Sequence, residues 1–126
     1  MLAHPVARSE PRDGAIVSKA AIRAAERLGV SQRDLGTIIG VSESTVSRMK
    51  TGDFPLDRDP KAFELALLFI RLYRSLDAIV GGDAKAAASW LKSYNTALET
   101  RPIEAVQTIT GLLNVIEYLD SRRAPV

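Results

Sequence analysis

Apolar side chains recur every three or four residues along most of this chain, a spacing that places them on one face of an α-helix. The pattern predicts helices over residues 14–28, 31–39, 42–51, 61–80, 84–99, 102–108 and 111–120, separated by glycine, proline and short polar residues. We therefore expect an all-α protein. Residues 1–13 contain two prolines and no such pattern, and we expect them to form a flexible arm.

The first predicted helix, residues 14–28, carries an apolar stripe and a basic stripe. Ile16, Ala20, Ala24 and Leu28 make up the apolar stripe, which we expect to be buried. The basic stripe repeats every four residues, so its members share one face: Lys19, Arg23 and Arg27. This face is either simply solvated or contacts phosphate groups.

The pair of short helices over residues 31–52 has the clearest local signals in the chain. Ser31 and Ser42 are good N-caps for the two helices. Gly40 can take the left-handed backbone that ends the first helix, and Gly36 has no side chain to keep the second helix away. These features indicate a helix-turn-helix. A helical hairpin that only packs in a bundle is the alternative.

The second helix of this pair buries Val46 and Met49, so its remaining residues face outward. Small polar side chains and one arginine on a rigidly held helix suit the major groove of DNA. These outward residues are Glu43, Ser44, Thr45, Ser47 and Arg48.

Residues 59–82 read as one long central helix with apolar residues around more than half of its circumference. One stripe includes Leu65, Leu72 and Leu76, and the other includes Ile70 and Tyr73. Such a helix must be covered from two sides. We expect one side to pack within the chain and the other to be a candidate homodimer surface.

The C-terminal third, residues 83–126, reads as a small set of amphipathic helices. Asp83 is the expected N-cap of the first, and Pro102 starts the next after a break. Trp90, the only tryptophan, is either a core residue or part of a binding surface.

Composition narrows the function classes. The chain has no cysteine, and its single histidine lies in the arm, so no disulfide framework and no metal site is expected. No nucleophile–base set and no phosphate-cradling glycine loop is visible, so we expect neither an enzyme nor a cofactor. No stretch suits a membrane span or a secretory signal, which predicts a cytoplasmic protein. The net charge of +2 is small, so useful DNA affinity requires dimerisation.

Residues 31–52 resemble the helix-turn-helix of Xre/Cro-type repressors. The matching positions are Gln32, Leu35, Gly36, Ile39, Gly40, Val41, Ser42, Val46, Met49 and Gly52. The resemblance implies that Gln32 holds a DNA phosphate. It also implies that bases are read by Ser42, Glu43, Ser44 and Arg48, with Thr45 as a further backbone or base contact.

Residues 76–120 are similar to the toxin-binding domain of Xre/MbcA/ParS antitoxins. The ordered set that carries the similarity is Trp90, Leu91, Asn95, Leu98, Pro102, Gly111, Val115 and Leu119. The chain departs from the family pattern after Leu98, where Glu99-Thr100-Arg101 replaces a glycine-containing turn, and at its SRRAPV end.

The two resemblances imply a type II antitoxin with four segments: an arm (1–13), a helix-turn-helix unit (14–58), a central helix (59–82) and a toxin-binding domain (83–126). The implied partners are operator DNA, through which the antitoxin represses its own operon, and a RES-domain toxin that consumes NAD. In the family the C-terminal helices and tail lie at the entrance of the toxin's active site. The corresponding residues here are Glu117, Asp120, Arg122, Arg123 and Val126. A free-standing repressor and a helical adaptor without DNA binding are the alternatives.

Overall fold

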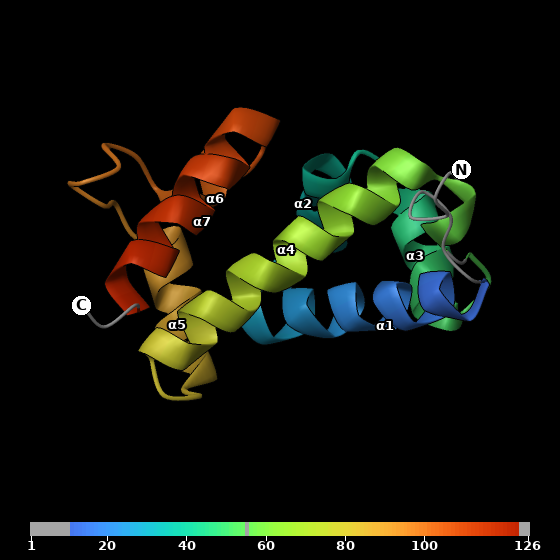
Figure 1. Ribbon diagram of the computed structural model, residues 1–126, viewed down its shortest axis with the longest axis horizontal. Coiled ribbons are helices and arrows are strands. Elements are labelled where there is room, and N and C mark those ends of the chain that lie inside the picture. The colour runs from blue at the N-terminus through green and yellow to red at the C-terminus, as the bar shows by residue number, and fades with distance from the viewer. Residues whose placement is uncertain (1–10, 55, 124–126) are drawn as a thin grey trace, which may run out of the picture.

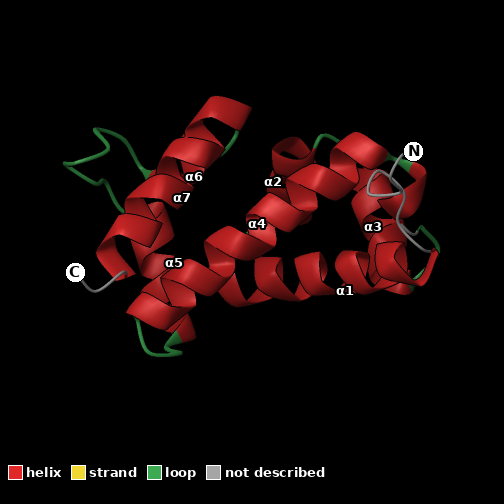
Figure 2. Ribbon diagram, viewed as in Figure 1, coloured by secondary structure: helices red, strands yellow, loops and turns green. Residues whose placement is uncertain are grey.

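The computed structural model describes residues 11–54 and 56–123, and the regular structure in these ranges is helical (Figures 1 and 2). The all-α prediction is therefore confirmed. The elements are α1 (Pro11–Leu28), α2 (Gln32–Ile39), α3 (Glu43–Thr51), the short 3-10 helix η2 (Leu56–Arg58), α4 (Pro60–Ile79), α5 (Ala84–Lys92), α6 (Pro102–Ala105) and α7 (Ile109–Arg123). No helix in the described part of the chain is long and apolar enough to cross a membrane.

Helix α4 is the central element of the fold. Helices α1 and α2 pack along it on one side, while α5 and α7 pack near its C-terminal end (Figure 1). Its inward side chains are almost fully buried and include Leu65, Phe69, Leu72 and Leu76. They belong to one continuous apolar cluster that runs from α1 to α7. The two halves of the molecule therefore share a single core.

Side-chain caps fix where four of the helices begin, as their sequences predict. The hydroxyls of Ser31 and Ser42 accept hydrogen bonds from the backbone N–H groups three residues on, at 3.0 and 3.1 Å. The carboxylates of Asp59 and Asp83 do the same for α4 and α5, both at 3.1 Å. Each cap satisfies one of the backbone donors that a helix start leaves without a partner.

Helix α1 begins three residues earlier than expected, at Pro11, so residues 11–13 are helical and this part of the flexible-arm prediction was wrong. The rest of that prediction, residues 1–10, lies outside the described residues. Proline suits the first helical position because it has no N–H to leave unpaired and its φ is already helical.

The buried face of α1 differs from the prediction in its N-terminal turns, whereas Ala24 and Leu28 are buried as expected. Gly14 lies so close to η2 that a Cβ atom there would approach Asp57 Oδ1 to 2.2 Å. This contact turns the face of Gly14, Val17 and Ala21 inward. Ile16 lies on the opposite side and is 61% exposed, so its placement in the buried stripe was wrong.

Helices α5 and α6 are shorter than their patterns suggest, whereas α7, Ile109–Arg123, extends beyond the predicted 111–120 at both ends. Helix α5 ends at Lys92, because Ser93 takes an extended backbone and its hydroxyl donates to Ser89 O at 2.7 Å. Helix α6 ends at Ala105, and α7 follows at Ile109. Gly111 lies inside α7, where a Cβ would approach Ala105 O to 1.8 Å, so only glycine lets the two helices meet this closely.

Candidate functional site

The turn between α2 and α3 is closed on Gly36. The backbone N–H groups of Gly40 and Val41 both donate to Gly36 O, at 2.8 and 2.9 Å. Gly40 has a φ of 81°, in the left-handed region, as predicted. A Cβ on Gly36 would lie 2.7 Å from Val41 O, so the missing side chain is what lets the turn pack against α2.

Helix α3 presents a polar surface to solvent. Val46 and Met49 are buried, while Ser44 and Arg48 are exposed, which confirms their predicted outward orientation. Three further side chains of the turn and α3 lie at the surface: Ser42, Glu43 and Ser47. Gln32, the predicted phosphate contact, is half-buried at the first position of α2.

Thr45 is buried rather than outward-facing, so its expected place on the exposed face was wrong. Its Oγ1 accepts hydrogen bonds from the Ser42 hydroxyl at 3.0 Å and from Arg48 Nη2 at 3.2 Å. These two bonds satisfy the hydroxyl of the buried threonine. The guanidinium of Arg48 also lies 5.3 Å from the ring centroid of Phe54. Thr45 and Phe54 thus hold Arg48 in one orientation, a role that spacing alone does not indicate.

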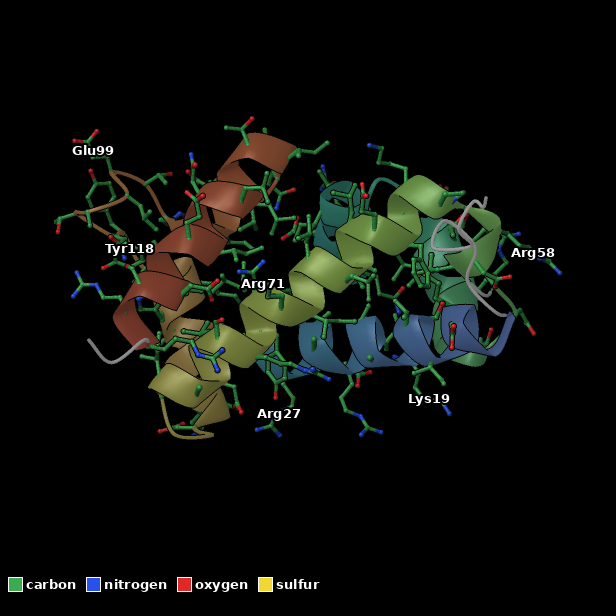
Figure 3. The ribbon with its side chains drawn as sticks, viewed as in Figure 1. Lys19, Arg27, Arg58, Arg71, Glu99 and Tyr118 are labelled. Carbon is green, nitrogen blue, oxygen red and sulfur yellow. The ribbon has the colours of Figure 1, made fainter. Side chains whose placement is uncertain are left out.

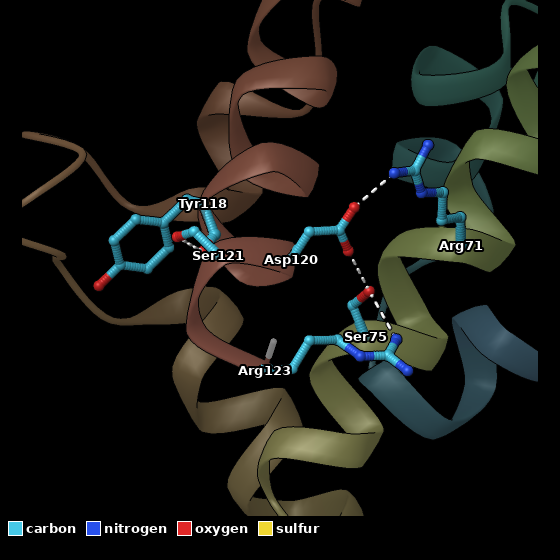
Figure 4. Close-up of polar contacts among 6 residues, drawn as sticks. All are labelled: Arg71, Ser75, Tyr118, Asp120, Ser121 and Arg123. Carbon is cyan, nitrogen blue, oxygen red and sulfur yellow. Dashed lines mark hydrogen bonds and ion pairs between the residues drawn. The ribbon is translucent and has the colours of Figure 1, made fainter. Parts of the chain in front are cut away.

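A polar cluster joins α4 to α7 (Figure 4). Ser75, which is fully buried, donates to Asp120 Oδ1 at 2.6 Å and accepts from Arg123 Nη1 at 3.0 Å. Arg71 forms an ion pair with the other carboxylate oxygen of Asp120. The Ser75 hydrogen bond, together with Arg71 and Arg123, lowers the pKa of Asp120 below its ordinary value, against the opposing effect of burial.

The opposite side of α7 carries an aromatic stack. The rings of Trp90, from α5, and Tyr118 lie nearly parallel, at 19°, with centroids 6.3 Å apart. The guanidinium of Arg122 lies 4.9 Å from the Tyr118 centroid. The predicted partner-binding residues therefore divide between two sides of the helix. Asp120 and Arg123 meet α4, Glu117 and Arg122 are exposed, and Val126 lies outside the described residues.

Tyr118 is absent from the residues that the sequence singled out. Its position four residues before Arg122, which lets the two side chains meet on one helical face, is the signal that could have identified it.

Comparison with known families separates the chain into two parts. Residues 7–71, more than half of the chain, match the antitoxin Xre-like helix-turn-helix domain. Residues 75–124 match the antitoxin Xre/MbcA/ParS C-terminal toxin-binding domain. The chain belongs to the Xre/MbcA/ParS antitoxin family. It is therefore an antitoxin rather than a free-standing repressor, as its second match indicates. No curated protein matches it.

The two matches of this antitoxin meet within α4. The first match ends at Arg71 and the second begins at Ser75, and Asp120 contacts both of these residues. One carboxylate in the toxin-binding domain thus bonds to the last residue of one match and the first residue of the other.

In the loop before α6, Glu99-Thr100-Arg101 stands where the family pattern has a glycine-containing turn. Asn95 Oδ1 accepts from the Leu98 N–H at 3.0 Å, and Asn95 pairs with Thr100 in an isolated bridge. Glu99, between them, has a φ of 59°, in the region that favours glycine. A non-glycine residue therefore takes the left-handed conformation in this turn.

We predict that Asp120→Asn lowers the free energy of unfolding by about 1 kcal/mol at pH 7, a modest figure because the aspartate side chain is 33% exposed. The lowered pKa of Asp120 means that its stabilisation is present above the ordinary carboxyl pKa. The stabilisation is lost as the pH falls through the folded-state pKa. Urea unfolding from pH 7 to pH 3 should therefore show the gap between the two proteins closing below about pH 4.

Glu104→Gln is the matched control, because Glu104 forms an exposed ion pair with Arg101 and loses the same charge. Its effect at pH 7 should stay within about 0.5 kcal/mol. A gap between wild type and Asp120→Asn that stays constant down to pH 3 would contradict the assigned role of the carboxylate.

Proposed function

We propose that this antitoxin neutralises a RES-domain toxin that consumes NAD, and that it represses its own operon by binding operator DNA. It acts by binding, without catalysis of its own, in the cytoplasm. The observation that carries the proposal is the placement of two distinct surfaces on one rigid helix. The exposed side of α3 lies toward the N-terminal end of α4, and α5–α7 lie at the other end (Figure 1).

Operator recognition rests on α3 and the start of α2. Ser44, Ser47 and Arg48 are exposed on α3 at the spacing of one helical face, where side chains can reach base edges in a major groove. Glu43 can accept a hydrogen bond from a cytosine amine, and Gln32 can donate to a phosphate at the N-terminus of α2. Because Thr45 and Phe54 already hold Arg48, little conformational entropy is lost when its guanidinium meets a base.

We predict that Arg48→Ala weakens operator binding by about tenfold or more at fixed salt, since a bidentate arginine–guanine contact contributes about 1–3 kcal/mol. Fluorescence anisotropy with labelled operator DNA measures this change. Arg101→Ala removes the same charge from an exposed position before α6, and it should leave the Kd within about twofold. Equal affinities for Arg48→Ala and wild type would remove Arg48 from the base-reading residues.

A homodimer formed through the central helix supplies the operator affinity that a monomer of such small net charge lacks. Leu67 on α4 is 46% exposed and Ile16 on α1 is 61% exposed. A cavity of about 340 Å³ lies where α1, α4 and α7 meet. Both side chains, together with Ile70, belong to the apolar part of its lining, and the polar cluster around Asp120 belongs to the polar part. Covering this apolar surface with a second copy would bring two α3 helices to one operator, as in dimeric helix-turn-helix proteins.

We predict that Leu67→Glu converts the dimer to a monomer in light scattering after gel filtration, because a charge in the apolar surface must be desolvated on association. Leu113→Glu is the control, because Leu113 is 42% exposed on α7, outside the proposed dimer surface. This variant should still have the mass of a dimer. A Leu67→Glu protein with the same mass as wild type would place the dimer interface elsewhere.

The C-terminal end of the chain provides groups that can fill a site built for a charged dinucleotide. Arg122 and Glu117 are exposed on the last turns of α7, and Val126 follows in the sequence. Such a mixture of acid and base can pair with phosphate-binding and base-binding groups of the toxin. The tail would then block the entrance of NAD.

We predict that a chain ending at Arg123 still binds the toxin with a Kd within about tenfold of wild type, yet no longer prevents NAD loss in a toxin assay. Stopping at Arg123 keeps the Ser75–Asp120–Arg123 cluster, so the truncation leaves the fold in place. The control Val126→Ala keeps the length and the terminal carboxylate. Full neutralisation by the truncated chain would exclude the tail from inhibition.

A further inference from the structure

We propose that the toxin docks on an aromatic face, formed by Trp90, Tyr118 and Arg122, and that this face supplies most of the binding energy. The inference rests on the proposed function for the identity of the partner, a RES-domain toxin. It assigns a side of the toxin-binding domain on which Tyr118, absent from the sequence-based candidates, is the central residue.

The aromatic face is accessible and already ordered. Trp90 and Tyr118 are partly exposed although they pack against the core, and their stacked rings brace one another. Arg122 is exposed above the Tyr118 ring and has no hydrogen bond or ion pair among the described residues.

The other side of α7 is already occupied. Asp120 and Arg123 already bond to Ser75 and Arg71 of α4, so a toxin that pairs with their charged groups competes with those bonds. Residues two apart on a helix point about 200° apart, so Tyr118 projects away from Asp120. Figure 4 shows this arrangement, with Tyr118 on the side of α7 remote from α4. A partner that approaches α7 from solvent therefore meets Tyr118 and Arg122 first.

The composition of the aromatic face matches that of binding hot spots. Tryptophan, tyrosine and arginine are the residues most enriched where truncation costs the most affinity. Because stacking fixes both rings and the guanidinium before binding, little side-chain entropy is lost on association. The partner surface that fits it is a flat apolar patch with a carboxylate placed to accept the free N–H fork of Arg122.

The position of the aromatic face permits toxin and operator to bind at the same time. Figure 3 shows Tyr118 at one end of the molecule and Arg58, near the α3–α4 connection, at the other. A toxin seated on Tyr118 thus leaves the exposed side of α3 free.

The test measures, by isothermal titration calorimetry, the affinity of full-length variants for a RES-domain toxin, the partner class of the proposed function. Tyr118→Ala should weaken binding by about 30-fold or more, and Arg122→Ala by about tenfold. Tyr118→Phe keeps the stacked ring and should stay within about threefold of wild type. The matched control is Leu113→Ala, an exposed apolar truncation on the same helix, which should bind like wild type.

Because Arg122 contacts Tyr118, we also expect the affinity losses of the two substitutions to be coupled in the double variant. Removing Tyr118 takes away the support of the guanidinium, so the two losses should be less than multiplicative in Tyr118→Ala/Arg122→Ala. Circular dichroism melts establish that each variant folds. If Tyr118→Ala does not fold, the affinity of Arg122→Ala alone tests the proposal, because Arg122 is exposed and its truncation should not disturb the fold.

The single tryptophan offers a second readout that needs no substitution. A chain labelled with 5-fluorotryptophan gives one ¹⁹F resonance, from Trp90. Adding unlabelled toxin should shift this resonance, whereas adding operator DNA alone should leave it unchanged. An unshifted signal in the toxin complex, or wild-type affinity in both Tyr118→Ala and Arg122→Ala, would show that the toxin does not dock on the aromatic face. The proposed function would still stand. A wild-type chain that does not bind the toxin would overturn the proposed function as well.

Discussion

Burial of the inward face of α4 against helices from both halves of the chain is the constraint on which the structure depends. Leu65 and Phe69 pack with the helix-turn-helix unit, while Leu76 lies near the end that meets the C-terminal helices, and all belong to one apolar cluster. A helix this apolar is stable in water only when it is covered from more than one side. Neither half of the antitoxin therefore closes a core without α4, and the two binding surfaces are fixed relative to one another.

Features set by local chemistry could be predicted from the sequence. The serine and aspartate caps, the left-handed Gly40 and the close approach at Gly36 each depend on residues within a few positions. Features set by distant contacts could not. The rotation of α1 depends on the fit of Gly14 against Asp57, and the approach of α6 to α7 depends on the Gly111 contact with Ala105. Apolar spacing does not encode either contact.

The candidate sites follow the same division. The outward side of α3 could be predicted from the apolar spacing of Val46 and Met49, but that spacing does not indicate that Thr45 is buried and bonded to Ser42 and Arg48. On α7 the polar residues flank the apolar stripe on both sides. Spacing alone could not say that Asp120 would meet Ser75 while Tyr118 would stack on Trp90. The family resemblance located the partner-binding region, and the packing divided it into an internal and an external side.

The continuity of α4 across the two family matches has a consequence for how such antitoxins can exchange halves. The matches meet between Arg71 and Ser75, inside an uninterrupted helix. Each residue inserted or deleted there would rotate one half against the other by about 100° and shift it by about 1.5 Å. Recombination between relatives at this point must therefore conserve the helical phase. Chimaeras joined in register should keep both binding surfaces, whereas chimaeras joined out of register should lose the core that the two halves share.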